Sequence, residues 1–170
     1  MERIAILSDV HGNLTALNTV INDIERRGIS KIYCLGDSVI KCANPDKVID
    51  ILHDKCEVML LGNCDEIICR PGIEYGRFWS RDRIGEKRAN YLYNLPVSYE
   101  FYMSGSLVRL FHATNTANNK VVLNINDIET KYEMFLPSEY TTSNKVADIV
   151  IYGHIHHPYM DKIYNKTLIN

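Results

Sequence analysis

The sequence predicts an α/β domain built around a parallel β-sheet. Five short apolar runs rich in β-branched residues have the length of buried strands, and they lie at 4–7, 32–35, 58–61, 107–111 and 149–152. Amphipathic helical patterns separate the first three runs, and this alternation implies parallel strands joined by right-handed crossovers. A length of 170 residues fits one domain, so we assign residues 1–170 to a single domain.

Two helices are predicted between the first three strands. The first has Asn13 as its N-cap and Gly28 at its end. Its apolar face comprises Leu14, Leu17, Ile21 and Ile24. The second begins at Asn44-Pro45, a cap followed by a proline at the first helical position. It buries Val48, Ile49 and Leu52.

The second half of the chain departs from a simple parallel pattern. Residues 63–95 are expected to be mostly helical, and residues 97–111 form two strands joined by Ser104-Gly105-Ser106. The remaining expectations are a polar loop at 113–120, a helix at about 125–135, a second polar loop at 138–145, and a hairpin over 159–169 that turns at Asn165-Lys166.

The composition excludes several classes of protein. Nineteen basic and 21 acidic residues give a net charge of −2, which argues against a partner that is a nucleic-acid polymer or a membrane surface. No apolar run approaches the roughly 18 residues of a membrane span. The five cysteines form no C-x-x-C pair, so a zinc knuckle is not expected. The N-terminus has no signal-peptide core, which predicts a cytoplasmic protein.

Metal-binding side chains follow each of the five predicted strands. They are Asp9, His11, Asp37, Asn63, His112, His154 and His156. Because the carboxyl ends of strands in open α/β sheets line one edge, we expect these side chains to converge. Glycine precedes three of them, at Gly36, Gly62 and Gly153, which predicts sharp backbone turns that aim the ligands inward.

The chemistry of these donors predicts a metal centre. Carboxylate, amide and imidazole groups without a required thiolate suit manganese, iron or zinc. Seven donors exceed the needs of one tetrahedral zinc, and a carboxylate can bridge two cations, so we predict a dinuclear centre with a shared water or hydroxide and Asp37 as the bridge. Each element alone could be a helix cap, a turn or a satisfied histidine; their recurrence favours the metal centre. His53 and His157 lack such partners, so a surface role is favoured for both.

Five segments of the chain resemble the signature of the calcineurin-like metallophosphoesterases, over residues 4 to about 158. They are Asp9-Val10-His11-Gly12-Asn13, Gly36-Asp37, Gly62-Asn63-Cys64-Asp65, His112 and Gly153-His154-Ile155-His156. The short length resembles the small prokaryotic branch that includes phosphodiesterases and diadenosine-tetraphosphate hydrolases. The resemblance implies a four-layered α/β/β/α sandwich with two mixed sheets.

The same resemblance implies two divalent metal ions, with manganese favoured and iron, zinc or nickel as alternatives. One ion is held by Asp9, His11, Asp37 and His156. The other is held by Asp37, Asn63, His112 and His154.

The activity implied by the resemblance is hydrolysis of phosphodiester or phosphoanhydride bonds by a metal-bridging hydroxide. Asp37, Asn63 and His112 would be the catalytic residues, and the substrate would be a phosphate ester, a nucleotide or a dinucleoside polyphosphate. A non-catalytic metal-binding or protein-interaction scaffold on the same fold is the alternative, and a homo-oligomer stays open. Because all seven positions keep competent donors, the sequence favours an enzyme.

Two features depart from the family pattern. Cys64 stands where many members have a histidine that is thought to protonate the leaving oxygen, and a thiol is a poor general acid. We therefore expect diesters, anhydrides and good leaving groups to be favoured over alkyl monoesters; the alternative for Cys64 is a small buried side chain. The chain also ends at Asn170, where relatives continue, which leaves a truncated product or a natural short form open.

Two regions are candidates for substrate contacts. Residues 70–102 interleave aromatic and basic side chains, which could hold a base and phosphates, although an amphipathic helix with buried aromatic and solvated basic residues is the favoured interpretation. The Asn-rich loop after His112 either reaches the substrate or is a flexible surface loop.

Overall fold

The first three predicted strands form a parallel sheet in the computed structural model, which describes residues 2–72 and 78–170. Strands β1 (Ile4–Leu7), β2 (Lys31–Cys34) and β3 (Val58–Met59) are neighbours in that order. β3 is shorter than the predicted run 58–61, because the backbone N–H of Leu61 leaves the sheet and donates to the carbonyl of Pro96 at 2.9 Å. The part of the helical prediction that falls on 73–77 lies outside the described residues.

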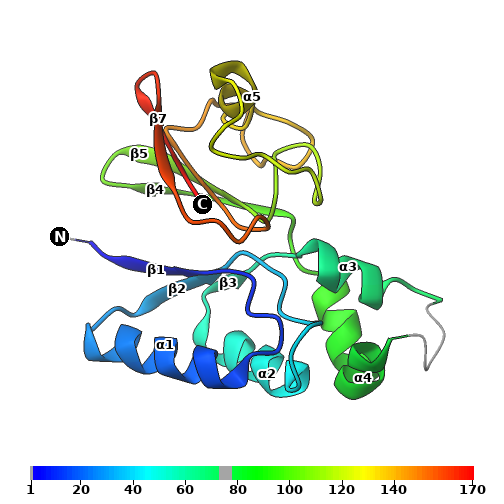
Figure 1. The fold of residues 1–170 in the computed structure, drawn as a ribbon. Coiled ribbons are helices and arrows are strands. Elements are labelled where there is room, and N and C mark those ends of the chain that lie inside the picture. The colour runs from blue at the N-terminus through cyan, green and yellow to red at the C-terminus, as the bar shows by residue number, and fades with distance from the viewer. Residues whose placement is uncertain (1, 73–77) are drawn as a thin grey trace.

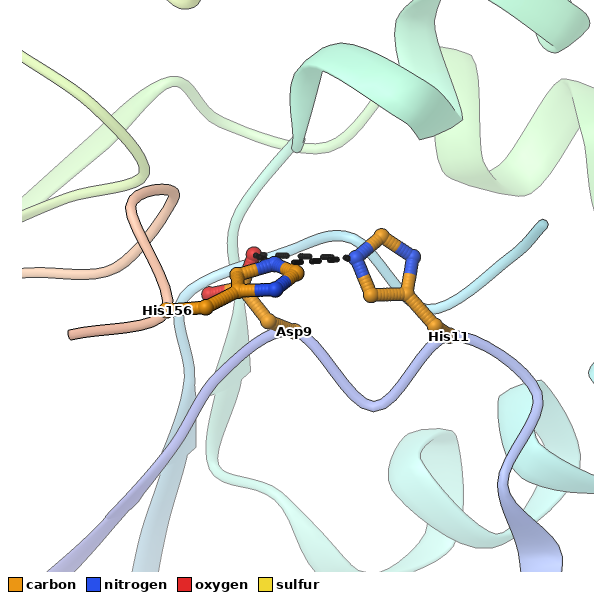
Figure 2. Close-up of side chains that lie close together, drawn as sticks. All are labelled: Asp9, His11 and His156. Carbon is orange, nitrogen blue, oxygen red and sulfur yellow. Dashed lines mark hydrogen bonds and ion pairs between the residues drawn. The ribbon is translucent and has the colours of Figure 1, made fainter. Parts of the chain in front are cut away.

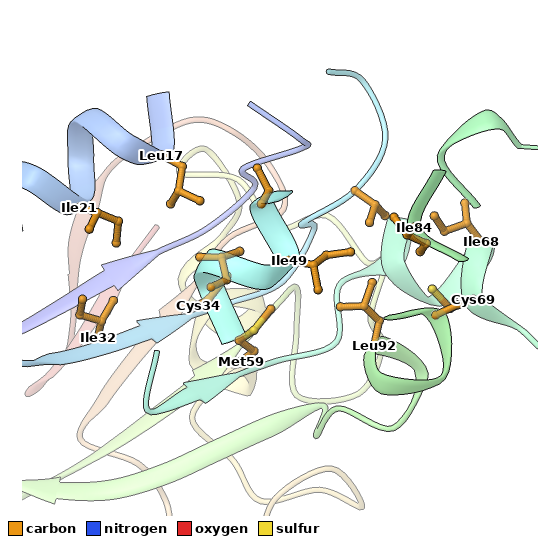
Figure 3. Packing of buried hydrophobic residues seen from close by; sticks show 14 of the residues in the cluster. Leu17, Ile21, Ile32, Cys34, Ile49, Met59, Ile68, Cys69, Ile84 and Leu92 are labelled. Atoms are coloured by element: carbon orange, nitrogen blue, oxygen red, sulfur yellow. The ribbon is translucent and has the colours of Figure 1, made fainter. Parts of the chain in front are cut away.

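Helices α1 (Leu14–Arg26) and α2 (Pro45–Lys55) cover one face of this sheet (Figure 1). The side chain of Asn13 caps α1 by accepting from the backbone N–H of Ala16 at 3.1 Å, and Gly28 follows the helix with φ +64°, as predicted. Figure 3 shows how the apolar helix faces pack on side chains of β2 and β3, including Leu17, Ile21, Ile32, Cys34, Ile49 and Met59. Each fully buried aliphatic side chain contributes roughly 1.5–3 kcal/mol.

The runs at 107–111 and 149–152 belong to a second sheet, so the prediction that all five runs form the core of one sheet is wrong. Its strand order is β4-β5-β6-β8-β7, and its strands are β4 (Ser98–Met103), β5 (Ser106–Phe111), β6 (Ile149–Tyr152), β7 (Met160–Ile163) and β8 (Lys166–Ile169). β5, β6 and β8 are parallel, and β4 and β7 are antiparallel to their neighbours. The second sheet is therefore mixed.

The two sheets face each other and bury a shared core (Figure 1). Tyr33 and Leu35 of the β2 segment meet Val108 and Leu110 of β5, and the rings of Tyr33 and Phe101 stack with their centroids 5.1 Å apart. The opposite face of β5 carries Leu107 and Phe111, which pack beneath the layer that contains α5 (Ile128–Glu133). This gives the four-layered α/β/β/α arrangement that the family resemblance implied. The described strands of the first sheet are all parallel, so only the second sheet is mixed.

Two hairpins complete the second sheet. The β4–β5 hairpin turns through Ser104 and Gly105, with φ values of +50° and +85°. The β7–β8 hairpin turns at Tyr164 and Asn165, one residue earlier than predicted. The reason is that Lys166 pairs with Ile163 in the ladder while its buried ammonium group donates to the carbonyl of Ala147 at 2.6 Å.

Helices α3 (Asn63–Cys69) and α4 (Trp79–Tyr93) pack on each other beside the first sheet. α4 is interrupted at Gly85, which has φ +71°. Within the described ranges, none of the helices has the length and apolar content to cross a membrane.

Candidate metal centre

Backbone hydrogen bonds hold together the loops at the carboxyl ends of the strands. The N–H of Asp9 donates to the carbonyl of Gly36 at 3.0 Å, and that of His11 donates to the carbonyl of Asp37 at 2.9 Å. In the second sheet, the N–H of Gly153 donates to the carbonyl of His112 at 2.9 Å. These bonds join the loop after β1 to that after β2, and the loop after β5 to that after β6.

A first group of donors contains Asp9, His11 and His156 (Figure 2). The Nε2 atom of His156 lies 3.0 Å from Oδ1 of Asp9 and 3.2 Å from Nε2 of His11. Although 145 positions separate His11 from His156, their rings lie together, tilted by 60° with centroids 5.1 Å apart. One carboxylate and two imidazoles therefore converge, as the sequence predicted.

The carboxylate of Asp37 lies between two histidines. Its Oδ2 atom is 3.7 Å from Nε2 of His11, and its Oδ1 atom is 3.4 Å from Nε2 of His112. Oδ1 of Asn63 lies 2.9 Å from the same Nε2 of His112. The ring of His154 lies edge-on to that of His112, with the centroids 5.2 Å apart. All seven predicted donors thus lie around one place.

Two buried histidines are oriented by backbone carbonyls. Nδ1 of His11 lies 2.8 Å from the carbonyl oxygen of Val39, and Nδ1 of His112 lies 2.9 Å from that of Leu35. Because a carbonyl can only accept, each Nδ1 carries a proton, and in the neutral ring each Nε2 keeps the lone pair that can bind metal. This outer hydrogen bond is the usual arrangement for a metal-binding histidine, so both residues fit the role.

The protonation states also suit a cation. Burial lowers the pKa of His11, although the carbonyl of Val39 and the charge of Asp37 oppose the shift. Burial and the neighbouring His112 lower the pKa of His154. Burial alone would raise the pKa of Asp9, but the hydroxyl of Ser8, 2.5 Å away, and the imidazole of His112 lower it overall. Neutral imidazoles and an ionised carboxylate are the forms that bind metal.

Five of the seven candidate ligands have left-handed backbone conformations. The φ values are +55° for Asp9, +49° for His11, +54° for Asp37, +70° for His154 and +53° for His156. Such conformations are uncommon outside glycine, cost roughly 1–3 kcal/mol each when strained, and gather at functional sites. The ligand residues themselves therefore make most of the sharp turns.

This finding corrects the predicted role of two glycines. Gly62 and Gly153 do not adopt left-handed conformations; they allow close approach instead. A Cβ atom on Gly62 would lie 2.1 Å from the backbone nitrogen of Asp37, and one on Gly153 would lie 1.9 Å from Oγ of Ser8. Only Gly36, with φ +106°, also makes a turn of the predicted kind.

Sequence reasoning assigned no role to Asp65, which is fully buried. Its Oδ1 atom accepts from the backbone N–H groups of Ser38 at 3.0 Å and Val39 at 3.2 Å, and Oδ2 accepts from that of Gly62 at 3.2 Å. Burial and the charge of Asp37 raise the pKa of Asp65 to about 7. Asp65 ties the loop after β2 to the loop after β3. One sequence signal could have identified this role. Asp65 is the third residue of α3, a position from which an acidic side chain commonly accepts from the backbone N–H of the N-cap, here Gly62.

Lys41 is a second residue that the sequence did not reveal. Its Nζ atom lies 3.0 Å from Nε2 of His11, so an ammonium group reaches the edge of the centre. Ile40 and Lys41 both have left-handed backbones, with φ values of +64° and +72°. The N–H of Cys42 donates to the carbonyl of His11 at 2.8 Å and holds this turn in place. No motif in the sequence predicts this contact between Lys41 and His11.

Cys64 lies beside the centre. Its backbone N–H donates to Oδ1 of Asp37 at 2.8 Å, and its thiol groups with donor atoms of His11 and Asp37. Burial, with a contribution from the charge of Asp37, raises the pKa of the thiol. The side chain is half-buried, so the alternative of a merely buried small residue describes it only in part.

Comparison with known families decides the membership of this chain. Residues 2–170 match the model of the calcineurin-like phosphoesterase superfamily domain. The chain belongs to this superfamily. The family resemblance predicted from the five motifs is thereby confirmed, and so is its coverage of almost the whole chain. Members of the superfamily are metal-dependent hydrolases, and the clustered histidines and aspartates of this calcineurin-like phosphoesterase could hold metal.

Relatives with known sequences or structures agree. The uncharacterized protein MJ0912 of Methanocaldococcus jannaschii is 29% identical over 175 residues, covering 98% of this chain and 68% of the relative. The hypothetical protein PH1004 of Pyrococcus horikoshii OT3 has a TM-score of 0.78 at 16% identity, covering 99% of this chain and 75% of that one. A metallophosphoesterase of Sphaerobacter thermophilus has a TM-score of 0.73 at 21% identity, with the same coverage. The two structures share the fold.

The remaining candidates lie elsewhere in this phosphoesterase. His53 packs against the ring of Tyr91 between α2 and α4, with the centroids 4.8 Å apart. Two basic residues of α4 pair with acidic residues of α2: Arg83 with Asp46 at 3.1 Å and Arg88 with Asp50 at 2.6 Å. These contacts favour the interpretation of α4 as a packed helix. Trp79 departs from it, because 52% of its surface is exposed. Arg77 lies outside the described residues.

Proposed function

We propose that this protein hydrolyses phosphodiester or phosphoanhydride bonds with two divalent metal ions. The observation that carries the proposal is the position of Asp37, whose two carboxylate oxygens face different histidines. A carboxylate in this position can share its oxygens between two cations. Membership of the phosphoesterase superfamily supports the same activity.

The donors divide into two sets that share Asp37. Asp9, His11, Asp37 and His156 would hold one ion. Asp37, Asn63, His112 and His154 would hold the other. Mixed oxygen and imidazole donors suit manganese, with iron, zinc or nickel as alternatives. When bound, the ions supply a water nucleophile at neutral pH and positive charge toward the phosphoryl oxygens.

The residues of the chain set the electrostatics of the site. Two aspartates supply the negative charge among the seven donors, and burial lowers the pKa of His11 and His154, so the charge of two dications would be only partly compensated. The site would therefore attract an anionic phosphoryl group. The raised pKa of the Cys64 thiol makes it a weak proton donor to the leaving oxygen. Substrates that need little protonation, such as aryl diesters and anhydrides, are favoured.

The test is a manganese-supplemented assay of a nitrophenyl diester, a dinucleoside polyphosphate and an alkyl monoester. We expect turnover of the first two, and loss of at least about a thousandfold in kcat for Asp37→Ala because the shared ligand is gone. The control is Asp23→Ala, at a half-buried aspartate of α1 that pairs with Arg26 and Arg27. Faster turnover of the alkyl monoester would contradict the role given to Cys64.

Metal content separates the proposal from its alternatives. Elemental analysis of the manganese-loaded protein should find two ions per chain. One ion would support a single-metal regulatory site, and none would support a scaffold that does not bind metal. Either result would refute the two-ion proposal.

A further inference from the structure

A polar cleft of about 390 Å³ adjoins the candidate metal centre. One of its walls is a single face of α3, where Asn63, Glu66 and Ile67 recur at helical spacing, with Arg70 directly after the helix. The other wall is formed by residues 117–119 of the Asn-rich loop, with Tyr140 beside them. The volume lies at the lower end of the range of small-ligand pockets, roughly 300–1,000 Å³.

The cleft meets the metal centre at two points. Asn63, which lines it, places its Oδ1 atom 2.9 Å from Nε2 of His112. The backbone of Asn119, on the opposite wall, lies close to the ring of His154. A phosphoryl group held at the centre would therefore have one ester substituent beside this cleft.

The loop that forms the second wall is firmly anchored. Asn115 is 6% exposed, and its side-chain amide donates to the carbonyl of Glu133 at 2.9 Å and to that of Leu136 at 3.1 Å. The hydroxyl of Ser138 donates to the carbonyl of Asn115. The hydroxyl of Thr114 donates to the carbonyl of Ala117 at 3.0 Å. The wall is preorganised, which favours binding over the flexible-loop interpretation.

The lining carries compensated charges and several neutral polar groups. One carboxylate oxygen of Glu66 pairs with the guanidinium of Arg70 at 2.9 Å, and the other accepts from the amide of Asn118 at 3.4 Å. Arg70 and Glu66 are the two charged residues among those that line the cleft, so the lining is neutral overall. Ile67, which is 45% exposed, and Tyr140 add apolar and aromatic surface.

We propose that this cleft binds a nucleoside attached to the phosphoryl group, so that the protein acts on nucleoside phosphodiesters. A nucleoside is uncharged, has a flat base that stacks on an aromatic ring or an apolar side chain, and offers hydrogen-bonding groups to amides. The inference rests on the proposed function, because it assigns the substrate class of the same site.

The test compares two esters that release the same 4-nitrophenol. Thymidine 5′-(4-nitrophenyl phosphate) carries a nucleoside, and bis(4-nitrophenyl) phosphate does not. We expect kcat/KM of the wild-type protein to favour the thymidine ester. We expect Tyr140→Ala to reduce that preference about tenfold, mainly through KM, because a stacking surface is lost. Tyr102→Ala, at an exposed tyrosine on β4, is the matched control and should keep the preference.

A second variant guards against misfolding of the first. Ile67→Glu changes an exposed position of α3 and should likewise reduce the preference about tenfold, since it replaces apolar surface with charge. A binding measurement is independent of turnover: thymidine added to the metal-free protein should shift the side-chain amide NMR signals of Asn118 and Asn119. Ile67→Glu should weaken these shifts.

The outcomes separate the inference from the proposed function. Equal kcat/KM for the two esters in the wild-type protein, or an unchanged preference in active Tyr140→Ala and Ile67→Glu variants, would overturn the nucleoside site. Hydrolysis of neither ester would overturn the proposed function instead. In that case the thymidine titration would still decide whether the cleft binds a nucleoside, and unchanged amide signals would refute it.

Discussion

Asp37 combines two demands at the scale of a single residue. Its carboxylate faces His11 and His112, and it also lies close enough to the buried Asp65 to raise the pKa of that group. In the metal-free protein this charge is poorly compensated, whereas bound cations would neutralise it. The charge of Asp37 therefore lowers the stability of the metal-free protein and raises its affinity for metal.

Asp37→Ala should consequently separate stability from metal binding. We expect the metal-free variant to unfold at a temperature equal to or above that of the wild-type protein, because a repulsive buried charge is removed. Manganese at about 100 times the dissociation constant would stabilise the wild-type protein by about 2.7 kcal/mol. The variant should lose most of this gain. Thermal unfolding with and without manganese measures both effects, and an undiminished gain would contradict the bridging role.

The lowered pKa values of His11 and His154 predict a pH dependence of folding. Both rings titrate near 6.5 in the unfolded chain and below that value in the folded chain. Below pH 6.5 the unfolded state therefore binds more protons and stability falls, whereas above it the two rings contribute no dependence. The raised pKa of Asp65 gives the opposite dependence in this range. The histidine contribution is therefore measured as the free energy of urea unfolding at pH 7.5 minus that at pH 5.5, compared between the metal-free wild type and a variant. His11→Asn should show a smaller difference, and an identical difference would contradict the assignment.

At the scale of elements, Arg109 links β5 to the loops of the outer layer. Its guanidinium is fully buried, pairs with Glu100 of β4, and donates to the carbonyls of Phe135 at 2.8 Å and Lys145 at 2.7 Å. Glu100 in turn accepts from the hydroxyl of Thr142 at 2.9 Å. One side chain thus fixes the segments on both sides of the 138–145 loop.

Arg109→Met should destabilise the fold by roughly 3–5 kcal/mol, because it leaves the buried charge of Glu100 without its partner. The double variant Arg109→Met with Glu100→Met should lose less, since it removes both charges. The difference in unfolding free energy from urea titrations of wild type, both single variants and the double variant measures the coupling. Additive losses would show that the pair does not act together.

Local patterns predicted the elements of this fold well. The cap at Asn13, the proline start at Pro45 and the glycine after α1 are short-range signals, and the structure confirms their positions. The assignment of strands to sheets was wrong because β5 is covered on both faces. Apart from Arg109, its buried residues are apolar on both faces, so alternation could not show which layer each face meets. The β7–β8 turn was predicted one residue too late, because nothing in the local sequence shows that Lys166 pairs with Ile163 in the sheet.

The sequence predicted which seven donors converge, but the single sheet edge it gave as the reason explains only part of the convergence. Within each sheet the donors follow parallel strands that end at the same edge. That the two edges meet depends on the packing of the sheets. Lys41 and Asp65 were missed because their roles depend on tertiary contacts with His11 and with the backbone of Ser38, Val39 and Gly62. The role of Gly153 depends on the distance to Ser8, which no pattern in the sequence encodes.

At the scale of the whole molecule, the candidate centre joins the two sheets. Asp9, His11 and Asp37 follow strands of the first sheet, and His112, His154 and His156 follow strands of the second. The backbone N–H of His154 donates to Oδ2 of Asp9 at 2.9 Å, which is a direct link between them. Metal bound by both sets would hold the sheets together at this edge.

Hydrogen exchange tests this coupling. Manganese should slow exchange of the backbone N–H group of His154, because its bond to Asp9 opens only when the sheets separate locally. The amides of Tyr164 and Asn165, in the distant β7–β8 turn, are the internal control and should exchange at unchanged rates. Equal slowing at both places would indicate a general effect of the ion.

The close approach at Gly153 has a consequence for variants of this chain. One added methyl group there would collide with Ser8 and with the carboxylate of Asp9, and the collision would wedge the halves of the centre apart. Gly153→Ala would thus abolish cation binding while every donor stays in the polypeptide. A related chain that keeps all seven ligands would therefore bind metal only if it also keeps glycine at position 153, where there is room for a hydrogen atom and not for a methyl group.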